Sequence, residues 1–311
     1  MISPIKTYPG VDFVTIREGD DVPLAIEEVY RMYRSDLVRL AYRMLGSAAD
    51  AEDLVQELFA RLSDFDWSGV ANVKSYLAKA AVRRCIDALR ARASQRERYV
   101  GPWLPEPMLE APWEQPEEAS VREEQVRYAA LVLLETLSPP ERAVYVLKEL
   151  LGYRYPEIAD MLELTESNCR QLLSRAKRKL PRSIEGAPSD ARPDSRKAAE
   201  LFLQAVRTDR YDELVRRLAN DVKLISDGGG KRKAALRPII GIDRVAAFVR
   251  GVRAKGAFDG EFRIARWNGE PGLLLTRGGR PALAVLFETD EAGDIASIYY
   301  IVNPEKLPLS V

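Results

Sequence analysis

The side chains between positions 166 and 180 are of types that read base pairs. This segment carries five basic residues against one acid, on a chain whose 47 basic and 47 acidic residues balance. In the major groove of DNA, arginine pairs with guanine, and asparagine or glutamine pairs with adenine. Apolar residues recur at helical spacing and leave the polar side chains on the other face. The residues expected to face DNA are Ser167, Asn168, Arg170, Gln171, Ser174, Arg175, Lys177 and Arg178.

A short helix and a turn must position this segment. Residues 156–162 have an amphipathic helical pattern, residues 163–165 turn the chain, and Thr165 is expected to cap the longer helix. This arrangement predicts a helix-turn-helix, whose second helix enters the major groove. The alternative is an ordinary solvated helix in a bundle, because basic faces of helices are common on protein surfaces.

A first helical domain is predicted over residues 24–98. Apolar residues recur every three or four positions on both sides of Gly46, which ends one helix, and Asp50 opens the acidic first turn of the next. A polar break at residues 63–72 precedes a third helix from about residue 73 to residue 92. These features predict a compact helical bundle.

Proline-rich stretches separate the domains. Residues 101–116 hold five prolines, which disfavour helix, so residues 99–117 are expected to form an extended linker with two tryptophans. Such a linker would leave the spacing of its flanking domains adjustable. A second helical domain of about four short helices, residues 118–182, contains the helix-turn-helix, and a second linker is expected over residues 183–195.

Residues 196–311 predict an α+β domain. Helical periodicity at 197–220 and 245–252 alternates with five strand-like runs, which suggests antiparallel strands in a curled sheet. The runs are 222–226, 262–267, 272–276, 282–288 and 295–302. The predicted fold is therefore multidomain, with two all-α domains followed by an α+β domain.

Composition excludes several classes of protein. The chain has no histidine, which removes the commonest general base and nitrogen ligand of metals, and we expect no catalytic residues, metal or cofactor. Cys85 and Cys169 lie far apart in helical contexts, which indicates a reducing cytoplasm. No apolar run reaches the roughly 18 residues of a membrane span, so no membrane partner is expected.

The order of these motifs resembles the extracytoplasmic function (ECF) sigma factors. Residues 40–46 and 50–57 are similar to their region 2, and residues 144–149 and 157–159 are similar to their region 4. The resemblance implies two partners, promoter DNA and core RNA polymerase. The polymerase would be contacted at the clamp helices of its β′ subunit and at its β subunit. By the same resemblance, polymerase binding falls to Asp53, Gln56 and Glu57. Helix capping is the alternative role for such carboxylates.

The resemblance also implies how promoter DNA is contacted. The helix-turn-helix corresponds to the reader of the minus-35 element, and residues 63–72 correspond to the loop that holds an unstacked base of the minus-10 element. Such capture needs an aromatic wall and positive charge. Phe65 or Trp67 would supply the wall, although a place in the core suits either equally well. The candidate cations are Lys74, Arg83, Arg84, Arg90 and Arg92.

Three further stretches resemble the ECF subgroup that carries a fused SnoaL-like domain. They are residues 101–107, 227–231 and 303–307, with Glu305 where related sequences commonly have Asp. The implied role is regulation through contacts between domains. For the three glycines, a phosphate-binding nest and a tight hairpin are alternatives. The residues assigned to this role are Trp103, Leu104, Pro105, Asp227, Gly228, Gly229, Gly230, Lys231, Asn303, Pro304, Glu305, Lys306 and Leu307.

Three functions are therefore open. The sequence favours a sigma factor that directs promoter-specific initiation and is regulated in cis by its last domain. A ligand-responsive helix-turn-helix repressor would instead bind duplex DNA without polymerase. A SnoaL-type enzyme localised by DNA modules would need an acid pair, and no pair between residues 221 and 288 has persuasive spacing. A small molecule in the cone-shaped last domain is left open.

Overall fold

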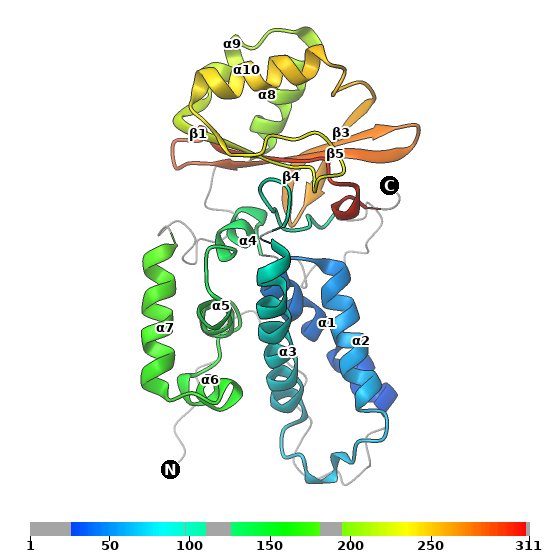
Figure 1. The fold of residues 1–311 in the computed structure, drawn as a ribbon, viewed down its shortest axis with the longest axis vertical. Coiled ribbons are helices and arrows are strands. Elements are labelled where there is room, and N and C mark those ends of the chain that lie inside the picture. The colour runs from blue at the N-terminus through cyan, green and yellow to red at the C-terminus, as the bar shows by residue number, and fades with distance from the viewer. Residues whose placement is uncertain (1–25, 97, 110–125, 181–194, 309–311) are drawn as a thin grey trace.

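The computed structural model describes residues 26–96, 98–109, 126–180 and 195–308, and these ranges form three bodies (Figure 1). Two helical domains lie side by side, and a sheet domain lies across one end of both. Among the described residues, no helix has the length and apolar character that a membrane crossing requires. The predicted fold class, two all-α domains followed by an α+β domain, is confirmed.

The first domain is a three-helix bundle. It consists of α1 (Ile26–Leu45), α2 (Ala48–Arg61) and α3 (Val73–Arg96), with a short 3-10 turn, η1 (Trp67–Gly69). The chain turns between α1 and α2 at Gly46, whose φ is +68°. Ser47 then caps α2, because its hydroxyl accepts a hydrogen bond from the Asp50 amide at 3.3 Å.

The second domain contains the predicted helix-turn-helix. Its elements are α4 (Tyr128–Leu134), α5 (Pro139–Tyr145), the π-helix η3 (Val146–Leu150), α6 (Tyr155–Leu162) and α7 (Glu166–Lys179). The turn is made by Glu163, which has a left-handed φ of 55°. Thr165 caps α7 as expected, since its hydroxyl accepts a hydrogen bond from the Asn168 amide at 3.2 Å.

The two helical domains share one hydrophobic core. A single cluster of buried side chains runs from α1 through α3 to α5 and α7. Arg142 joins the two domains, and its side chain is only 2% exposed. Its guanidinium donates hydrogen bonds to the Met44 carbonyl at 2.8 Å and to the Glu135 carboxylate at 2.7 Å. The helical domains are therefore closed against each other.

The last domain is a six-stranded sheet covered by helices on one face. Its elements are α8 (Ser195–Thr208), α9 (Asp212–Arg216), β1 (Leu218–Asp227), β2 (Ile239–Ile240), α10 (Ile242–Ala254), β3 (Glu261–Trp267), β4 (Glu270–Arg277), β5 (Arg280–Thr289), β6 (Ile295–Ile301) and η6 (Pro304–Lys306). The strand order is β2-β1-β6-β5-β4-β3. The helices α8 and α10 lie on the face away from the helical domains (Figure 1).

Two expectations about this domain were wrong. The sheet is not wholly antiparallel, because β1 and β6 pair in parallel, with Leu224 opposite Ile298. Most of the domain lies between these two strands, which gives the long crossover that parallel pairing needs. The predicted helix at 197–220 also ends early. Residues 218–220 already belong to β1, although Leu214 and Leu218 are both buried at a helical spacing.

The described part of the first linker, residues 98–109, is packed against the other bodies. It lies between the sheet and both helical domains, and Leu104 in its middle is 1% exposed. Leu109 forms a β-bridge with Trp267 at the edge of the sheet. Apolar side chains and backbone groups of these residues are buried against the sheet, so the spacing that the sequence predicts to be adjustable is fixed as long as this contact lasts.

Candidate nucleic-acid interfaces and the interdomain contact

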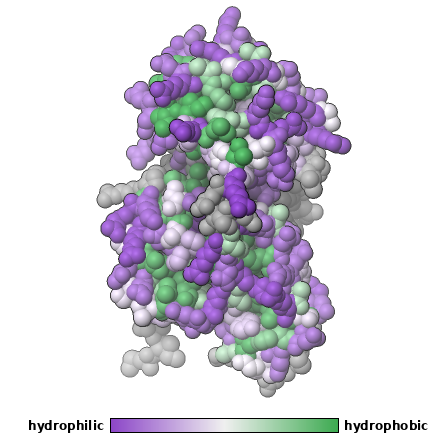
Figure 2. Space-filling view, viewed as in Figure 1, coloured by the Kyte–Doolittle hydropathy of each residue, from purple (hydrophilic) through white to green (hydrophobic). Residues whose placement is uncertain are grey.

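The outer face of α7 presents the residues predicted to read DNA. An open hollow of about 430 Å³ lies along it, lined by Ser167, Arg170, Gln171, Ser174, Arg175 and Arg178. These six side chains and Asn168 are exposed, whereas Lys177 is half-buried and pairs with Glu149 at 3.1 Å. Figure 2 shows mostly hydrophilic side chains along the left edge, where α7 lies. The helix thus offers donors and positive charge to a groove.

Arg170 is held in position on this face. Its guanidinium pairs with Glu166 at 2.8 Å, one helical turn earlier, and lies 4.6 Å from the centre of the Tyr155 ring. Both contacts restrict this long side chain, so it would lose less conformational entropy on binding a partner. For Arg175 and Arg178 the described part of the chain provides no ion pair, so their charges face solvent.

The residues assigned to polymerase binding share one exposed face of α2. Asp53, Gln56 and Glu57 all lie on the side of the helix opposite Leu54, Val55 and the core. Glu57 forms an ion pair with Arg61 one turn later and lies 3.8 Å from Arg84. The face is therefore accessible to a partner, and one predicted minus-10 cation, Arg84, lies beside it.

Two cations of α3 are occupied by the helix-turn-helix. Arg83 donates through Nε to the Met161 carbonyl at 3.1 Å and pairs with Glu163 at 2.5 Å. Lys79 pairs with Asp160 at 3.0 Å. The acids Asp160 and Glu163, at the end of α6, thus pair with two cations of α3. In this arrangement the Arg83 guanidinium contacts the helix-turn-helix, although its side chain stays 39% exposed.

The other predicted minus-10 residues are spread along α3 and its preceding loop. Arg90 is exposed beside Asp87, Arg92 pairs with Asp50 at 2.7 Å, and Lys74 is half-buried. Arg90 and Arg92 thus pair with acids of the first helical domain.

An aromatic cluster surrounds η1, with Phe65 before it, Trp67 within it and Tyr76 in α3. Trp67 is 9% exposed and meets Phe65 edge-on, with ring centres 4.9 Å apart. Phe65, which is half-buried, stacks on Tyr76 at 5.1 Å. The burial of Trp67 favours a packing role over base stacking, and Tyr76 is a member of the cluster that the sequence did not reveal.

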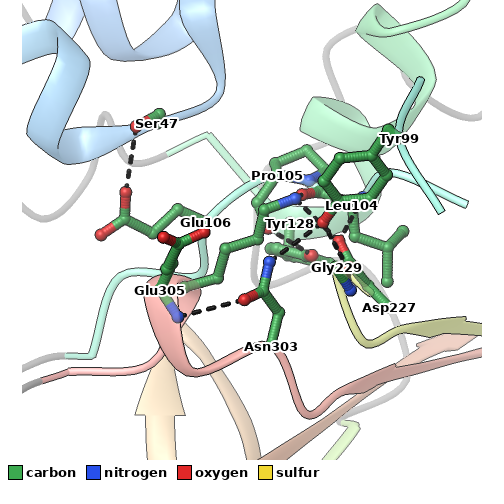
Figure 3. Close-up of polar contacts among 11 residues, drawn as sticks. Ser47, Tyr99, Leu104, Pro105, Glu106, Tyr128, Asp227, Gly229, Asn303 and Glu305 are labelled. Atoms are coloured by element: carbon green, nitrogen blue, oxygen red, sulfur yellow. Dashed lines mark hydrogen bonds and ion pairs between the residues drawn. The ribbon is translucent and has the colours of Figure 1, made fainter. Parts of the chain in front are cut away.

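A buried carboxylate joins the linker to the sheet domain (Figure 3). Asp227, at the end of β1, is fully buried, and its carboxylate accepts four hydrogen bonds. Its Oδ1 accepts from the Tyr99 hydroxyl at 2.6 Å and from the Gly229 amide at 3.0 Å. Its Oδ2 accepts from the Leu104 amide at 2.9 Å and from Lys306 at 2.7 Å. We call Asp227 and these four partners the Asp227 cluster.

Lys306 is enclosed by the linker. Its ammonium group donates to the Leu104 carbonyl at 2.5 Å and lies 4.0 Å from the Trp103 ring and 5.0 Å from the Tyr99 ring. Aromatic faces attract a cation, and this attraction strengthens when water is excluded. Burial, together with the neighbouring Asp227 carboxylate, raises the pKa of Tyr99 above its usual range. Tyr99 therefore keeps its proton and donates at neutral pH.

The glycines after β1 are needed for close packing and do not form an anion nest. Gly229 has a φ of +58°, and a Cβ there would lie 2.4 Å from the Asn303 side chain. A Cβ on Gly228 would lie 2.2 Å from the Arg232 carbonyl. Because the Gly229 amide already donates to Asp227, it does not serve a phosphate. The segment is a tight turn, and Lys231 beyond it pairs with Glu305.

Glu106 ties the linker to α2. Its carboxylate accepts hydrogen bonds from the Ala48 amide at 2.8 Å and the Ser47 hydroxyl at 3.2 Å, and its own amide donates to the Gly46 carbonyl at 2.7 Å. A carboxylate at a helix N-terminus satisfies free amides and complements the helix dipole. The linker therefore fixes the start of the helix that carries the polymerase-binding candidates.

Tyr42 joins the first helical domain, the linker and the sheet. Its hydroxyl donates to the Glu106 carbonyl at 2.7 Å and accepts from the Asn268 amide group at 2.9 Å. Asn268 in turn accepts from the Met108 amide at 3.0 Å. On the other side, the Tyr128 hydroxyl of α4 donates to the Pro105 carbonyl at 2.7 Å. Both helical domains are thereby attached to one linker.

Comparison with known proteins agrees with this division into domains. The Sigma-70 region 2 family matches residues 29–95, and the Sigma-70, region 4 family matches residues 127–180. The ECF RNA polymerase sigma factor SigJ of Mycobacterium tuberculosis is 33% identical over 294 residues, which cover 89% of this chain and 91% of SigJ. The chain belongs to the ECF RNA polymerase sigma factors. Its role is promoter-specific initiation of transcription, and its helical domains are called region 2 and region 4 below.

The last domain of this sigma factor is also shared with relatives. The probable ECF sigma factor SigI of Mycobacterium tuberculosis is 29% identical over 302 residues, 91% of this chain and 94% of that protein. The crystal structure of SigJ superposes with a TM-score of 0.72 at 29% identity, covering 90% of this chain and 99% of that one. The similarity therefore extends through all three bodies.

Sequence reasoning missed several residues of the interdomain contact in this sigma factor. They are Tyr42, Tyr99, Glu106, Tyr128 and Asn268. Glu106 lies in a stretch that the sequence singled out, residues 101–107, and Tyr99 lies in the predicted extended linker, but neither side chain was assigned a role. The partners of Tyr128 and Asn268 lie 23 and 226 residues away along the chain, so no local pattern marks them.

Proposed function

We propose that this sigma factor is held closed by its own last domain and opens to engage the promoter. Region 2 binds core polymerase through the face of Asp53, Gln56 and Glu57 and contacts the minus-10 element. Region 4 places α7 in the major groove of the minus-35 element. The last domain regulates both in cis, because it holds the linker that connects them.

The observation that carries this proposal is the burial of the linker in the Asp227 cluster. Asp227 is fully buried and the Lys306 side chain is 10% exposed, so both charges have left water. A buried ion pair is costly to break on one side only, because the remaining charge is left without a partner. Asp227 and Lys306 both belong to the last domain, and both bond to Leu104 of the linker. The last domain therefore holds the linker in one conformation as long as this ion pair is intact.

A second observation supports a closed form that excludes DNA. The pairs of Arg83 with Glu163 and of Lys79 with Asp160 occupy the α3 cations that face region 4. These pairs are partly solvent-exposed, and exposed pairs contribute little free energy. They therefore direct the closed packing while the Asp227 cluster and the shared core hold it. Promoter DNA competes with them once region 4 moves away.

We further propose that the chain acts in the cytoplasm as a non-enzymatic factor without a cofactor. Membership in the sigma family favours initiation over the repressor and the enzyme, the two alternatives from the sequence. In the absence of polymerase, the repressor would bind duplex DNA tightly and the enzyme would turn over a substrate.

The experiment is reconstitution with core RNA polymerase. The purified full chain is mixed with core enzyme, passed over a sizing column and used to transcribe fragmented genomic DNA, after which start sites are mapped. We expect co-elution and a set of new start sites that share two upstream sequence elements. Absence of co-elution and of new start sites would overturn the proposal. Nanomolar binding to duplex DNA without polymerase would instead support a repressor.

Two variants make this test residue-specific. Arg175→Gln removes one charge from the DNA-facing side of α7, and Arg207→Gln removes one from α8 in the last domain. We expect the first to weaken initiation at mapped promoters and the second to leave it unchanged. Equal effects of both variants would show that α7 is not the reader.

A further inference from the structure

We propose that the last domain binds a small organic anion, a carboxylate or phosphate attached to an apolar body, in a cavity beside the 302–307 segment. This inference rests on the proposed regulatory function and names the class of ligand that would act through it. The cavity lies where the turn between β4 and β5 approaches the end of β6 and the loop after β1.

The cavity has the size of a small-molecule site. Its volume is about 470 Å³. Sites for small ligands commonly measure roughly 300 to 1,000 Å³ and combine apolar walls with a few polar groups. The apolar part of the wall comes from Ala257, Pro281, Val302 and Leu307. This apolar surface requires a ligand with a hydrocarbon or aromatic body.

The charge of the cavity has one sign. Its lining includes Arg232, Lys233, Arg277 and Arg280, and no acid is among the lining residues that the structure describes. Four cations around one hollow repel each other, and a bound anion relieves this repulsion. The cavity therefore selects a negatively charged group over a neutral or positive one.

Two of the lining side chains are positioned to contact that group. Arg277 donates through Nε and Nη2 to the carbonyls of Asp259 at 2.7 Å and Ala257 at 2.6 Å, so its guanidinium is fixed while Nη1 takes no part in these bonds. Burial raises the pKa of Tyr300 to about 12, although Arg277 acts in the opposite direction. The Tyr300 hydroxyl is therefore protonated at neutral pH and is a donor for an anion.

A small molecule fits these observations better than a DNA backbone. Phosphates of a duplex are contacted by cations along an extended stripe or groove. Here the four cations instead surround a concave site with an apolar wall, and the cavity is on the last domain rather than on α7 or α3. DNA contact is nevertheless an outcome that the experiment below distinguishes.

The cavity shares a wall with the contact that holds the linker. Val302, Pro304 and Leu307 line the cavity, whereas Asn303 and Lys306 of the same short segment contact Tyr99 and Leu104 of the linker. The Val302 amide also donates to the Asp227 carbonyl at 2.9 Å. A ligand that prefers one position of this segment therefore shifts the equilibrium of the linker contact.

The test uses three probes that differ only in their head group. Binding of 2-naphthoate, 2-naphthyl phosphate and neutral 2-naphthol to the full chain is measured by calorimetry, in the absence of polymerase. Arg280→Gln and Arg232→Gln remove cavity charges, and Arg244→Gln, on the exposed side of α10, is the matched control. Hydrogen exchange of the 99–106 peptide is then followed with and without the tighter-binding anion.

We expect at least one of the two anions to bind about tenfold more tightly than 2-naphthol, as a charged hydrogen bond predicts. The tighter anion identifies the head group as carboxylate or phosphate. Each cavity variant should lose about tenfold in affinity, whereas Arg244→Gln should keep the wild-type value. Bound anion should change the exchange of the linker peptide.

Other outcomes would overturn the inference. Equal affinities for 2-naphthol and both anions would show that the cavity does not select a negative charge. Unchanged anion affinity in Arg280→Gln and Arg232→Gln would show that the anions do not bind in this cavity. The same variants are also titrated with a duplex DNA; if they weaken DNA binding but not anion binding, the basic patch contacts nucleic acid instead. Linker exchange that is the same with and without anion would remove the coupling. If the chain binds no anion but initiates transcription normally, only this inference is refuted. If it binds the anion but does not initiate transcription, only the proposed function is refuted.

Discussion

Replacement of Lys306 by methionine should release the linker from the last domain. Methionine keeps most of the volume of the lysine stem but removes the charge that faces the Asp227 carboxylate at 2.7 Å. The carboxylate would remain fully buried with its hydrogen bonds from Tyr99, Gly229 and the Leu104 amide but without a counter-ion. Breaking a buried pair on one side costs about 3 to 5 kcal/mol. The closed linker should lose about that amount of free energy relative to its released form.

Hydrogen exchange of the linker measures this loss directly. The Leu104 amide donates to Asp227, so it exchanges only when the contact opens. A cost of about 3 kcal/mol corresponds to an increase of roughly a hundredfold in the opening equilibrium, since each 1.4 kcal/mol is a factor of ten. We therefore expect the 99–106 peptide of Lys306→Met to exchange about a hundredfold faster or more, and run-off transcription with core polymerase to rise.

Lys231→Met is the matched control. Lys231 pairs with Glu305 close to the Asp227 cluster, but its side chain is 50% exposed. Exposed pairs are worth about 0 to 1 kcal/mol, so exchange of the linker peptide should rise less than about fivefold. The double variant Asp227→Asn with Lys306→Met removes both charges and should exchange more slowly than Lys306→Met. Equal exchange in Lys306→Met and Lys231→Met would refute the reasoning.

Three further changes test other parts of the account. Gly229→Ala and Gly278→Ala both place an alanine at positive φ, but only the first puts a Cβ against another side chain, at 2.4 Å from Asn303. Thermal unfolding should therefore show that Gly229→Ala is the less stable variant. The reverse order would contradict the described packing. Burial tends to raise the pKa of Glu141, but hydrogen bonds from Lys179 and Ser138 outweigh it, and the net pKa lies below the usual value of 4.5. The unfolded chain then takes up the proton first as the pH falls, so this stabilisation is present above about pH 4.5 and is lost as the pH falls through the lower pKa of the folded state. The free energy of unfolding of Glu141→Gln should therefore fall less steeply below that pH. An unchanged slope of stability against pH in this range would contradict the prediction. Arg175→Gln should weaken binding of the holoenzyme to its minus-35 element by about 1 to 3 kcal/mol in a gel-shift titration if it contacts a base, with the same loss for every sequence if it contacts only a phosphate.

The helix-turn-helix could be predicted because its signals are local. Thr165 caps α7 by a bond to a residue three positions away, and the apolar residues of α6 and α7 follow the helical period. The closed packing could not be predicted in this way. Arg83 and the Met161 carbonyl are 78 residues apart, and a basic side chain on α3 has the same local pattern whether it faces DNA or region 4.

The sheet domain shows a similar limit. Alternation of apolar and polar residues marks the strands, but it is the same for parallel and antiparallel neighbours, so the pairing of β1 with β6 was missed. Leu214 and Leu218 have helical spacing and are both buried, yet the helix ends between them because β1 must begin. The Asp227 cluster was found only in part. The motifs around Asp227 and Lys306 stood out in the sequence, whereas Tyr99 had no distinguishing neighbour.

The central claim, that the closed chain must open on the promoter, is tested most directly by the distance between region 2 and region 4. Fluorophores on Ser63→Cys and Arg154→Cys, both exposed positions, report this distance, since the two native cysteines are buried. We predict high energy transfer in the free chain and a clear decrease in the complex with core polymerase and promoter DNA. Energy transfer that stays at the value of the free chain throughout initiation would show that region 4 never leaves α3 and would contradict the account.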